Sequence, residues 1–170
     1  MELGKLYFFT ASIIRWINVL QNDERKRIIL DSFSYLNEKK LVKISAFVLM
    51  PNHIHIIWQL LDTKLQLRFM KYTAQQIKFH LAKNDPGLLD QFYVSKTDRS
   101  YQIWQRNPLA IELYSREVVE QKLDYIHNNP CQGKWQLADD PISYPYSSIR
   151  FYEDKDNSFQ FLSHYMDIIS

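Results

Sequence analysis

The chain has 170 residues, of which 46% are hydrophobic and 15% aromatic. This composition predicts a folded core of about one domain and excludes a disordered chain. The formal net charge is only +2, so the bulk charge gives little support for nucleic-acid binding. The single cysteine, Cys131, excludes a disulfide framework and a multi-cysteine zinc site.

The segment MELGKLYFFT lacks the charged and then long apolar pattern of a signal peptide. No apolar run approaches the roughly 18 residues that a membrane span needs. We therefore expect a cytoplasmic protein. Because glycine and proline are scarce, we expect one domain over residues 1–170, with a core over about 5–130 and an aromatic-rich tail over 131–170.

The chain begins with a strand pattern followed by a helix pattern. Lys5 to Ile14 is rich in Tyr, Phe, Thr and Ile, which predicts a strand. Residues 22–39 mix charged and apolar side chains at helical spacing, which predicts an amphipathic helix. Asn22 or Asp23 is expected to cap this helix.

Two further strands are predicted over Leu41 to Leu49 and over His53 to Leu60. Met50-Pro51-Asn52 separates them, because proline restricts the residue before it and Pro-Asn suits a tight turn. The short connection predicts an antiparallel hairpin.

The pattern of strands and helices continues in the second half of the chain. Residues 64–83 predict a second helix, 84–99 predict a loop or irregular insertion, and Ser100 to Gln105 predicts a fourth strand. A last helix is expected from the capping residue Ser115 to about Asn128. The order of elements predicts an α+β fold, a ferredoxin-like sandwich in which helices cover one face of an antiparallel sheet, with an extra C-terminal helix. The tail is expected to pack back on this body.

His53 and His55 lie two residues apart on a predicted strand, so both side chains point to the same face. The opposite face carries Ile54, Ile56, Trp58 and Leu60, and we expect that face to pack against the helices. Two neighbouring imidazoles can hold one divalent metal. They can equally be ordinary polar residues on a half-exposed strand, and the metal interpretation needs a third ligand.

Tyr125 and Asn129 lie four residues apart near the end of the last predicted helix and share one of its faces. The carbonyl oxygen of Asn129 is a candidate third ligand. Tyr125 is a candidate nucleophile if it is deprotonated or if a metal polarises its target phosphate. By itself it is one of 11 tyrosines, and without the histidine pair a packing role would be the better interpretation. His127 and Asn128 compete as residues that can bind a metal or cap the helix end.

The stretch FVLMPNHIHII resembles the His–apolar–His motif of the HUH single-tyrosine transposases. The segments YIHNNP and DPISYPYSS resemble the REP-associated tyrosine transposases. The resemblance covers Leu6 to about Tyr152, and the His pair precedes the tyrosine by about 70 residues, in the order that the family shows. One departure is Tyr146, which stands where related sequences often have tryptophan.

The resemblance implies a DNA transposase with His53, His55 and Asn129 as metal ligands and Tyr125 as the nucleophile on the C-terminal helix. It implies Mg²⁺ or Mn²⁺ as the cofactor. It also implies cleavage and rejoining of single-stranded DNA near a hairpin through a 5′-phosphotyrosine link. The expected partner is single-stranded or hairpin DNA, and the protein is expected to act as a monomer or a homodimer.

Binding of DNA also needs cations for phosphates and aromatic side chains for unstacked bases. The candidates are Lys71, Lys78, Arg99, Trp104, Gln105 and Arg106. Lysines on amphipathic helices commonly just face solvent, and Trp104 can equally belong to the core. Two other functions are consistent with the residues: a metal hydrolase with a water nucleophile, and a non-enzymatic nucleic-acid-binding module.

Overall fold

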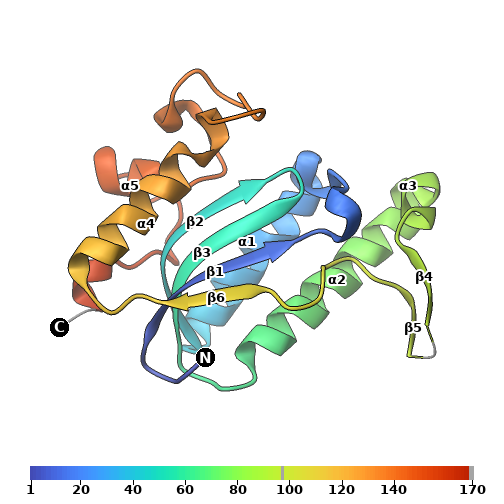
Figure 1. Cartoon of the computed structure of the whole chain (residues 1–170), viewed down its shortest axis with the longest axis horizontal. Coiled ribbons are helices and arrows are strands. Elements are labelled where there is room, and N and C mark those ends of the chain that lie inside the picture. The colour runs from blue at the N-terminus through green and yellow to red at the C-terminus, as the bar shows by residue number, and fades with distance from the viewer. Residues whose placement is uncertain (97, 169–170) are drawn as a thin grey trace.

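A four-stranded antiparallel sheet forms the centre of the protein, with strand order β2-β3-β1-β6 (Figure 1). The strands are β1 (Leu6–Ser12), β2 (Val42–Met50), β3 (His53–Leu60) and β6 (Leu109–Glu112). The structure is a computed structural model that describes residues 1–96 and 98–168, without the side chains of residues 96 and 99.

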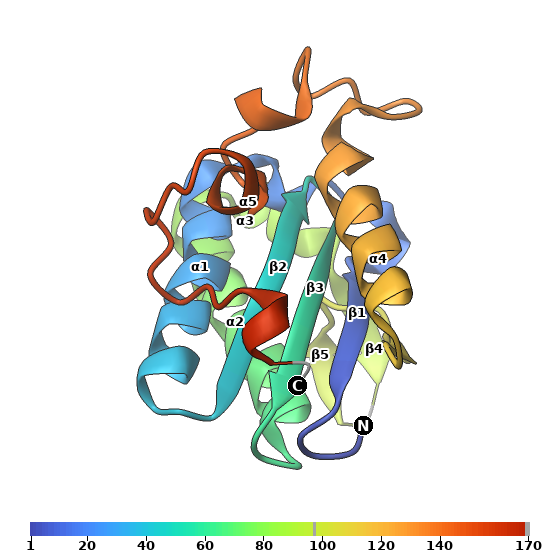
Figure 2. The same cartoon turned by 90° about the vertical axis from the view of Figure 1, so that its left-hand side faces the viewer.

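Helices cover both faces of the sheet. The helices α1 (Asp23–Glu38) and α2 (Leu65–Asn84) lie on one face, and α4 (Arg116–Asn128) lies on the other (Figure 2). The first two helices and the four strands form the predicted ferredoxin-like sandwich, and α4 is the predicted extra helix. Asn22 caps α1 by accepting a hydrogen bond from the backbone of Arg25, and Ser115 caps α4 in the same way, so both predicted caps are confirmed.

The alternation of side chains along β3 divides the core into two parts. Ile54, Ile56, Trp58 and Leu60 pack in the larger cluster under α1 and α2. Ile57 faces the opposite way and packs in a smaller cluster with Val119, Leu123 and Ile126 of α4. Both faces of β3 are therefore buried, which explains its nearly continuous apolar sequence.

The predicted fourth strand over Ser100 to Gln105 is wrong. Residues Arg99–Tyr101 form β5, which pairs with β4 (Tyr93–Lys96) in a separate two-stranded sheet. The fourth strand of the main sheet is β6, whose side chains are largely exposed because it lies at the sheet edge. Ile103 and Trp104 are buried in the larger core cluster although they belong to no strand. Their apolar side chains gave the segment a strand-like pattern.

The segment predicted as a loop over residues 84–99 contains regular structure. A short helix, α3 (Pro86–Asp90), follows α2 directly, and β4 comes after it. Asp85 accepts a hydrogen bond from the backbone of Leu88, and Pro86 occupies the first helical position. The Asp-Pro pair that ends α2 therefore also begins α3.

The tail packs back on the body, as predicted, and covers the outer edge of β2 (Figure 2). The backbone of Leu49 donates to Tyr146, that of Ser148 donates to Phe47, and that of Ser163 donates to Ile44. These bonds satisfy backbone groups that a free edge strand would expose.

The tail contains α5 (Ile149–Glu153). Five 3₁₀ helices complete the described structure: Ile14–Trp16, Val19–Gln21, Asn129–Cys131, Pro141–Ser143 and Tyr165–Asp167.

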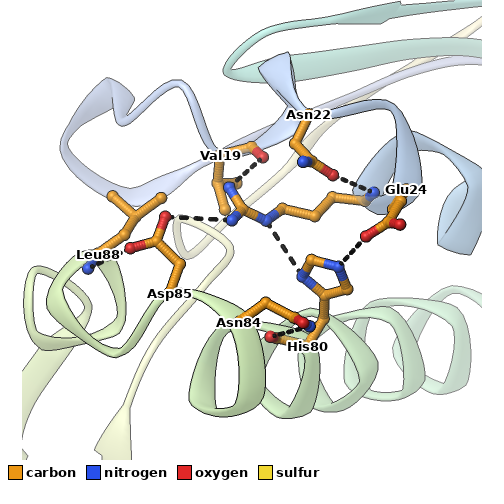
Figure 3. Close-up of polar contacts among 8 residues, drawn as sticks. Val19, Asn22, Glu24, His80, Asn84, Asp85 and Leu88 are labelled. Carbon is orange, nitrogen blue, oxygen red and sulfur yellow. Dashed lines mark hydrogen bonds and ion pairs between the residues drawn. The ribbon is translucent and has the colours of Figure 1, made fainter.

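A buried arginine joins α1 to the end of α2 (Figure 3). The guanidinium of Arg25 donates to the carbonyl oxygen of Val19, to Nδ1 of His80 and to the carboxylate of Asp85, at 3.3 to 3.4 Å. His80 in turn contacts Glu24 through Nε2 at 2.7 Å. This network fixes the two helices relative to each other on one side of the sheet.

None of the helices in the described part of the chain has the length and apolar character needed to span a membrane.

Candidate metal and tyrosine site

His53 and His55 lie side by side on β3, with ring centroids 4.8 Å apart. Their relative exposures are only 8% and 5%. We expected them on the face away from α1 and α2, and they are there, but α4 and the chain that follows it cover that face. The rings of Tyr125 and Trp135 lie 5.2 Å from His55 and 5.8 Å from His53. The pair is thus a buried site and not a half-exposed strand surface.

The Nδ1 atom of each histidine has a hydrogen-bond partner. Nδ1 of His55 lies 2.7 Å from Oγ1 of Thr10, which the register of β1 and β3 places directly opposite. Nδ1 of His53 lies 2.8 Å from Oδ1 of Asn52. Nε2 of His55 is buried and has no hydrogen-bond partner among the described residues. This arrangement leaves Nε2 of His55 for a ligand.

Asn52 is itself held in one orientation. Its Nδ2 donates to the carbonyl oxygen of Trp16 at 3.1 Å, so its Oδ1 is the atom that accepts from His53. The ring of His53 therefore carries its proton on Nδ1 and a lone pair on Nε2, the form that binds metals. Trp16 has a positive φ of 57°, a backbone conformation that residues other than glycine rarely adopt.

Burial keeps both histidines neutral near pH 7. It lowers the pKa of His53 to about 4, against a smaller raising effect of the neighbouring Asn129 side chain. Burial also lowers the pKa of His55 to about 3, with further contributions from His53 and Lys122. Neutral imidazoles can donate their lone pairs to a metal without first losing a proton.

Tyr125 and Asn129 both reach the histidine pair from α4 and its end. The ring of Tyr125 lies 5.2 Å from that of His55 and remains 44% exposed, so substrate can reach it. Asn129 directly follows α4 with helical backbone angles, which keeps it one turn beyond Tyr125. Its buried Oδ1 has no hydrogen-bond partner among the described residues.

This donor set fits a divalent metal. The two imidazole rings are neighbours, the Asn129 side chain lies next to His53, and Nε2 of His55 and Oδ1 of Asn129 are buried without partners among the described residues. Buried polar atoms without partners are costly unless a ligand satisfies them. No group of three His, Cys, Asp or Glu residues suited to a metal occurs in the described chain, so the third ligand would be an amide oxygen. The two competing candidates, His127 and Asn128, have other partners: Nε2 of His127 contacts Ser148, and Nδ2 of Asn128 donates to the backbone of Asp124.

Several residues of the site were not expected from the sequence. The ring of Phe8 stacks on His55 at 5.2 Å, and Nζ of Lys122 lies 5.0 Å from the centre of that phenyl ring and 5.7 Å from that of Tyr125. Lys122 precedes Tyr125 by three residues, a spacing that places both on one helix face. That spacing could have identified Lys122 from the sequence. The positions of Thr10 and Phe8 beside His55 depend on the register of β1 and β3, which the sequence does not give.

The residues predicted to contact DNA fall into two groups. Lys71, Lys78 and Trp104 line one cleft on the α2 side of the sheet. Gln105 and Arg106 are exposed just beyond it. Arg99 belongs to β5, but its side chain lies outside the described part of the structure. Among the described side chains, those of Lys71, Lys78, Trp104, Gln105 and Arg106 form no hydrogen bond or ring contact with the histidine pair.

Tyr146, the departure from the related sequences, lies away from the site. Nζ of Lys26 lies 4.0 Å from the centre of its ring, and its backbone oxygen accepts from Leu49. The aromatic ring therefore packs the tail against α1.

Comparison with solved structures bears on the fold. The solved structure of a REP-associated tyrosine transposase bound to a REP hairpin has a TM-score of 0.62 to this chain, at 18% identity, and the match covers 88% of this chain and 79% of that one. The chain has the fold of a REP-associated tyrosine transposase. A candidate transposase from Deinococcus radiodurans R1 is more distant, with a TM-score of 0.42, 16% identity, and coverage of 72% and 88%.

Sequence comparison does not identify a family for the chain. No protein-family model matches the chain. An uncharacterised protein of Haemophilus influenzae is 30% identical over 100 residues, which are 52% of this chain and 54% of that protein. The match thus spans about half the length of the curated relative.

Proposed function

We propose that the chain belongs to the HUH single-tyrosine transposases and cleaves and rejoins single-stranded DNA near a hairpin. The observation that carries the proposal is the approach of one exposed tyrosine, Tyr125, to two buried neutral histidines with an unpartnered Nε2 and an unpartnered amide oxygen beside them. The structural neighbour bound to a REP hairpin supports hairpin DNA as the partner.

In this proposal Oη of Tyr125 attacks the scissile phosphorus. A bond forms between the phenolic oxygen and phosphorus, and the bond to the 3′-oxygen of the upstream nucleotide breaks. The products are a free 3′-hydroxyl and a 5′-phosphotyrosine link. Rejoining reverses these events, because a 3′-hydroxyl attacks the same phosphorus and releases the phenol. The energy of the phosphodiester is conserved, so no nucleotide triphosphate is needed.

His53, His55 and Asn129 would hold Mg²⁺ or Mn²⁺. Such an ion supplies stabilisation of the charge that develops on the phosphate oxygens. The protein supplies the rest: Asn52 and Thr10 orient the imidazoles, and Phe8 packs beside the tyrosine and His55. The exposed edge of Tyr125 leaves an approach for the strand.

We further propose that each chain completes its own site, since Tyr125 contacts the His55 of the same chain. A mixture of Tyr125→Phe and His53→Gln proteins would then not regain cleavage. Recovery of activity in the mixture would instead show that the tyrosine helix works in a partner.

The test is a covalent-adduct assay on hairpin-bearing single-stranded DNA with Mg²⁺ or Mn²⁺. Tyr125→Phe should abolish the protein–DNA adduct and retain DNA binding. The matched control is Tyr114→Phe, because Tyr114 is 81% exposed and lies outside the site. An adduct that survives Tyr125→Phe would overturn the proposal. Cleavage without any adduct would indicate a water nucleophile, and binding without cleavage, unaffected by EDTA, would indicate a binding module.

A further inference from the structure

A cleft of about 460 Å³ is lined by residues of α2 and of the segment Tyr101 to Trp104. This volume is within the range of ligand-binding pockets, about 300 to 1,000 Å³. The polar and aromatic residues of the lining are Lys71, Gln75, Lys78, Tyr101, Gln102 and Trp104. We call this feature the α2 cleft.

The α2 cleft is separate from the tyrosine site, but the segment that lines it is hydrogen-bonded to the strand that pairs with His53. Helix α2 lies on the opposite side of the sheet from α4, which carries Tyr125 (Figure 2). At the end of the sheet, the backbone of Gln105 donates to Ser12 at 2.7 Å, and Ser12 pairs with His53. A DNA strand that leaves the tyrosine site around this end of the sheet would therefore meet the cleft.

The charge of the cleft suits a phosphodiester. Lys71 and Lys78 lie two helical turns apart on α2, and neither forms an ion pair with another described residue. The described lining contains no acidic side chain. Two unpaired ammonium groups with no neighbouring carboxylate in that lining form a local positive potential that the overall charge of +2 conceals.

The inner wall of the cleft suits a base. Gln102 is only 8% exposed, and its Nε2 donates to the backbone of Trp104 at 3.0 Å. Its buried Oε1 has no partner among the described residues, so it is available to accept a hydrogen bond from a ligand. Nε1 of Trp104 donates to Thr73, which fixes the indole as a rigid wall. Met70 and Ile103 add apolar lining.

We propose that the α2 cleft binds one unpaired nucleotide of the single-stranded DNA next to the cleavage point. Lys71 and Lys78 contact its phosphates, and the base lies against the apolar wall with its edge toward Oε1 of Gln102. This inference rests on the proposed function for the identity of the ligand. The two can fail separately, because adduct formation depends on Tyr125 and the cleft is measured by binding.

The first test measures the salt dependence of binding to a single-stranded oligonucleotide. For single strands the slope of log affinity against log salt is about 0.7 per phosphate contacted. Lys71→Ala with Lys78→Ala should therefore reduce the slope by about 1.4. The matched control is Lys43→Ala with Lys83→Ala, which removes two exposed lysines outside the cleft. Equal slopes for the two double variants would overturn the proposal.

The second test uses oligonucleotides with a single abasic position moved along the strand. One position should weaken binding by the wild-type protein about ten-fold, in line with the contribution of a single stacked base. Gln102→Met, which keeps the size of the side chain and removes the acceptor, should reduce this difference. Thermal unfolding checks that the variant is folded, and the lysine pair tests the cleft without changing the core.

The outcomes are distinct. If Tyr125 forms an adduct but neither the lysine pair nor any abasic position matters, the cleft proposal is wrong and the proposed function stands. If the cleft behaves as expected and no adduct forms, the cleft is a nucleotide site of a protein that does not cut. A protein that shows no single-strand binding at all would contradict both.

Discussion

Nδ1 of His53 donates a hydrogen bond of 2.8 Å to Oδ1 of Asn52. The direction of this bond is fixed because Nδ2 of Asn52 donates to the backbone of Trp16. The Asn of the Met-Pro-Asn lead-in thus controls which nitrogen of the histidine faces the site. A residue behind a candidate metal ligand can in this way set the orientation of that ligand.

Asn52→Ala should weaken binding of Mn²⁺ by about 10- to 100-fold, the usual cost of losing a partner behind a metal-binding histidine. Isothermal titration calorimetry measures this change directly. Asn18→Ala serves as the control, because Asn18 has an exposed side chain and lies in a different connection, the one between β1 and α1. Unchanged affinity in Asn52→Ala would show that His53 is oriented by other contacts or is not a ligand.

Lys122 is expected to assist Tyr125, since its ammonium lies over the rings of Phe8 and Tyr125. A cation there can stabilise negative charge on the phenolic oxygen or on the phosphate. Lys122→Met should slow adduct formation by about 100-fold, and Lys122→Arg should retain most of the rate. Single-turnover assays on hairpin DNA measure both. Gln121→Met, at the exposed neighbouring position, should have the wild-type rate; a similar loss there would point to general damage to α4.

His127 should make the fold sensitive to acid. Burial lowers its pKa from 6.5 to about 4, so between these values the unfolded chain binds a proton that the folded chain excludes. The free energy of unfolding should therefore fall as the pH drops from 6.5 to about 4, by about 1.4 kcal/mol per pH unit for this residue. His53 and His55 have lowered pKa values and act in the same direction.

Urea unfolding at a series of pH values tests this expectation. His127→Gln should have a shallower dependence of unfolding free energy on pH than the wild-type protein, whatever its absolute stability. Parallel curves for the two proteins would mean that His127 titrates in the fold as it does in the unfolded chain.

Arg25→Met should destabilise the protein, because it leaves the carbonyl of Val19 and Nδ1 of His80 without their donor (Figure 3). Each buried group that loses its partner costs about 1 to 3 kcal/mol. The bond to Asp85 adds less, since that carboxylate is 43% exposed. We expect a total loss of about 2 to 4 kcal/mol in urea unfolding. Arg27→Met, at an exposed position of α1, should change stability by less than about 0.5 kcal/mol.

Much of the fold could be predicted from the sequence because its signals are local. The alternation over His53 to Leu60 gave the strand with its boundaries and divided its two faces correctly. The caps Asn22 and Ser115 gave the starts of two helices. The fourth strand was missed because β6 (LAIE) is only four residues long and mostly exposed, which is too short for an alternation of buried and exposed side chains to stand out in the sequence.

The candidate site was predicted in its parts but not in its arrangement. The spacing of His53 and His55 and of Tyr125 and Asn129 is a property of a strand and a helix, and each pair could be placed on one face from the sequence. That the helix crosses the strand so that Tyr125 meets His55 depends on how α4 packs on the sheet. The partners of the rings, Thr10 and Asn52, depend on strand register and on a turn held by Trp16.

The sequence by itself determined the residue types and their local spacing, because strand alternation, helical periodicity and capping act between near neighbours. The tertiary structure decided burial: the same packing that covers His53 and His55 lowers their pKa values and leaves Nε2 of His55 and Oδ1 of Asn129 without partners among the described residues. Desolvation depends on all the surrounding chain, and no local pattern encodes it.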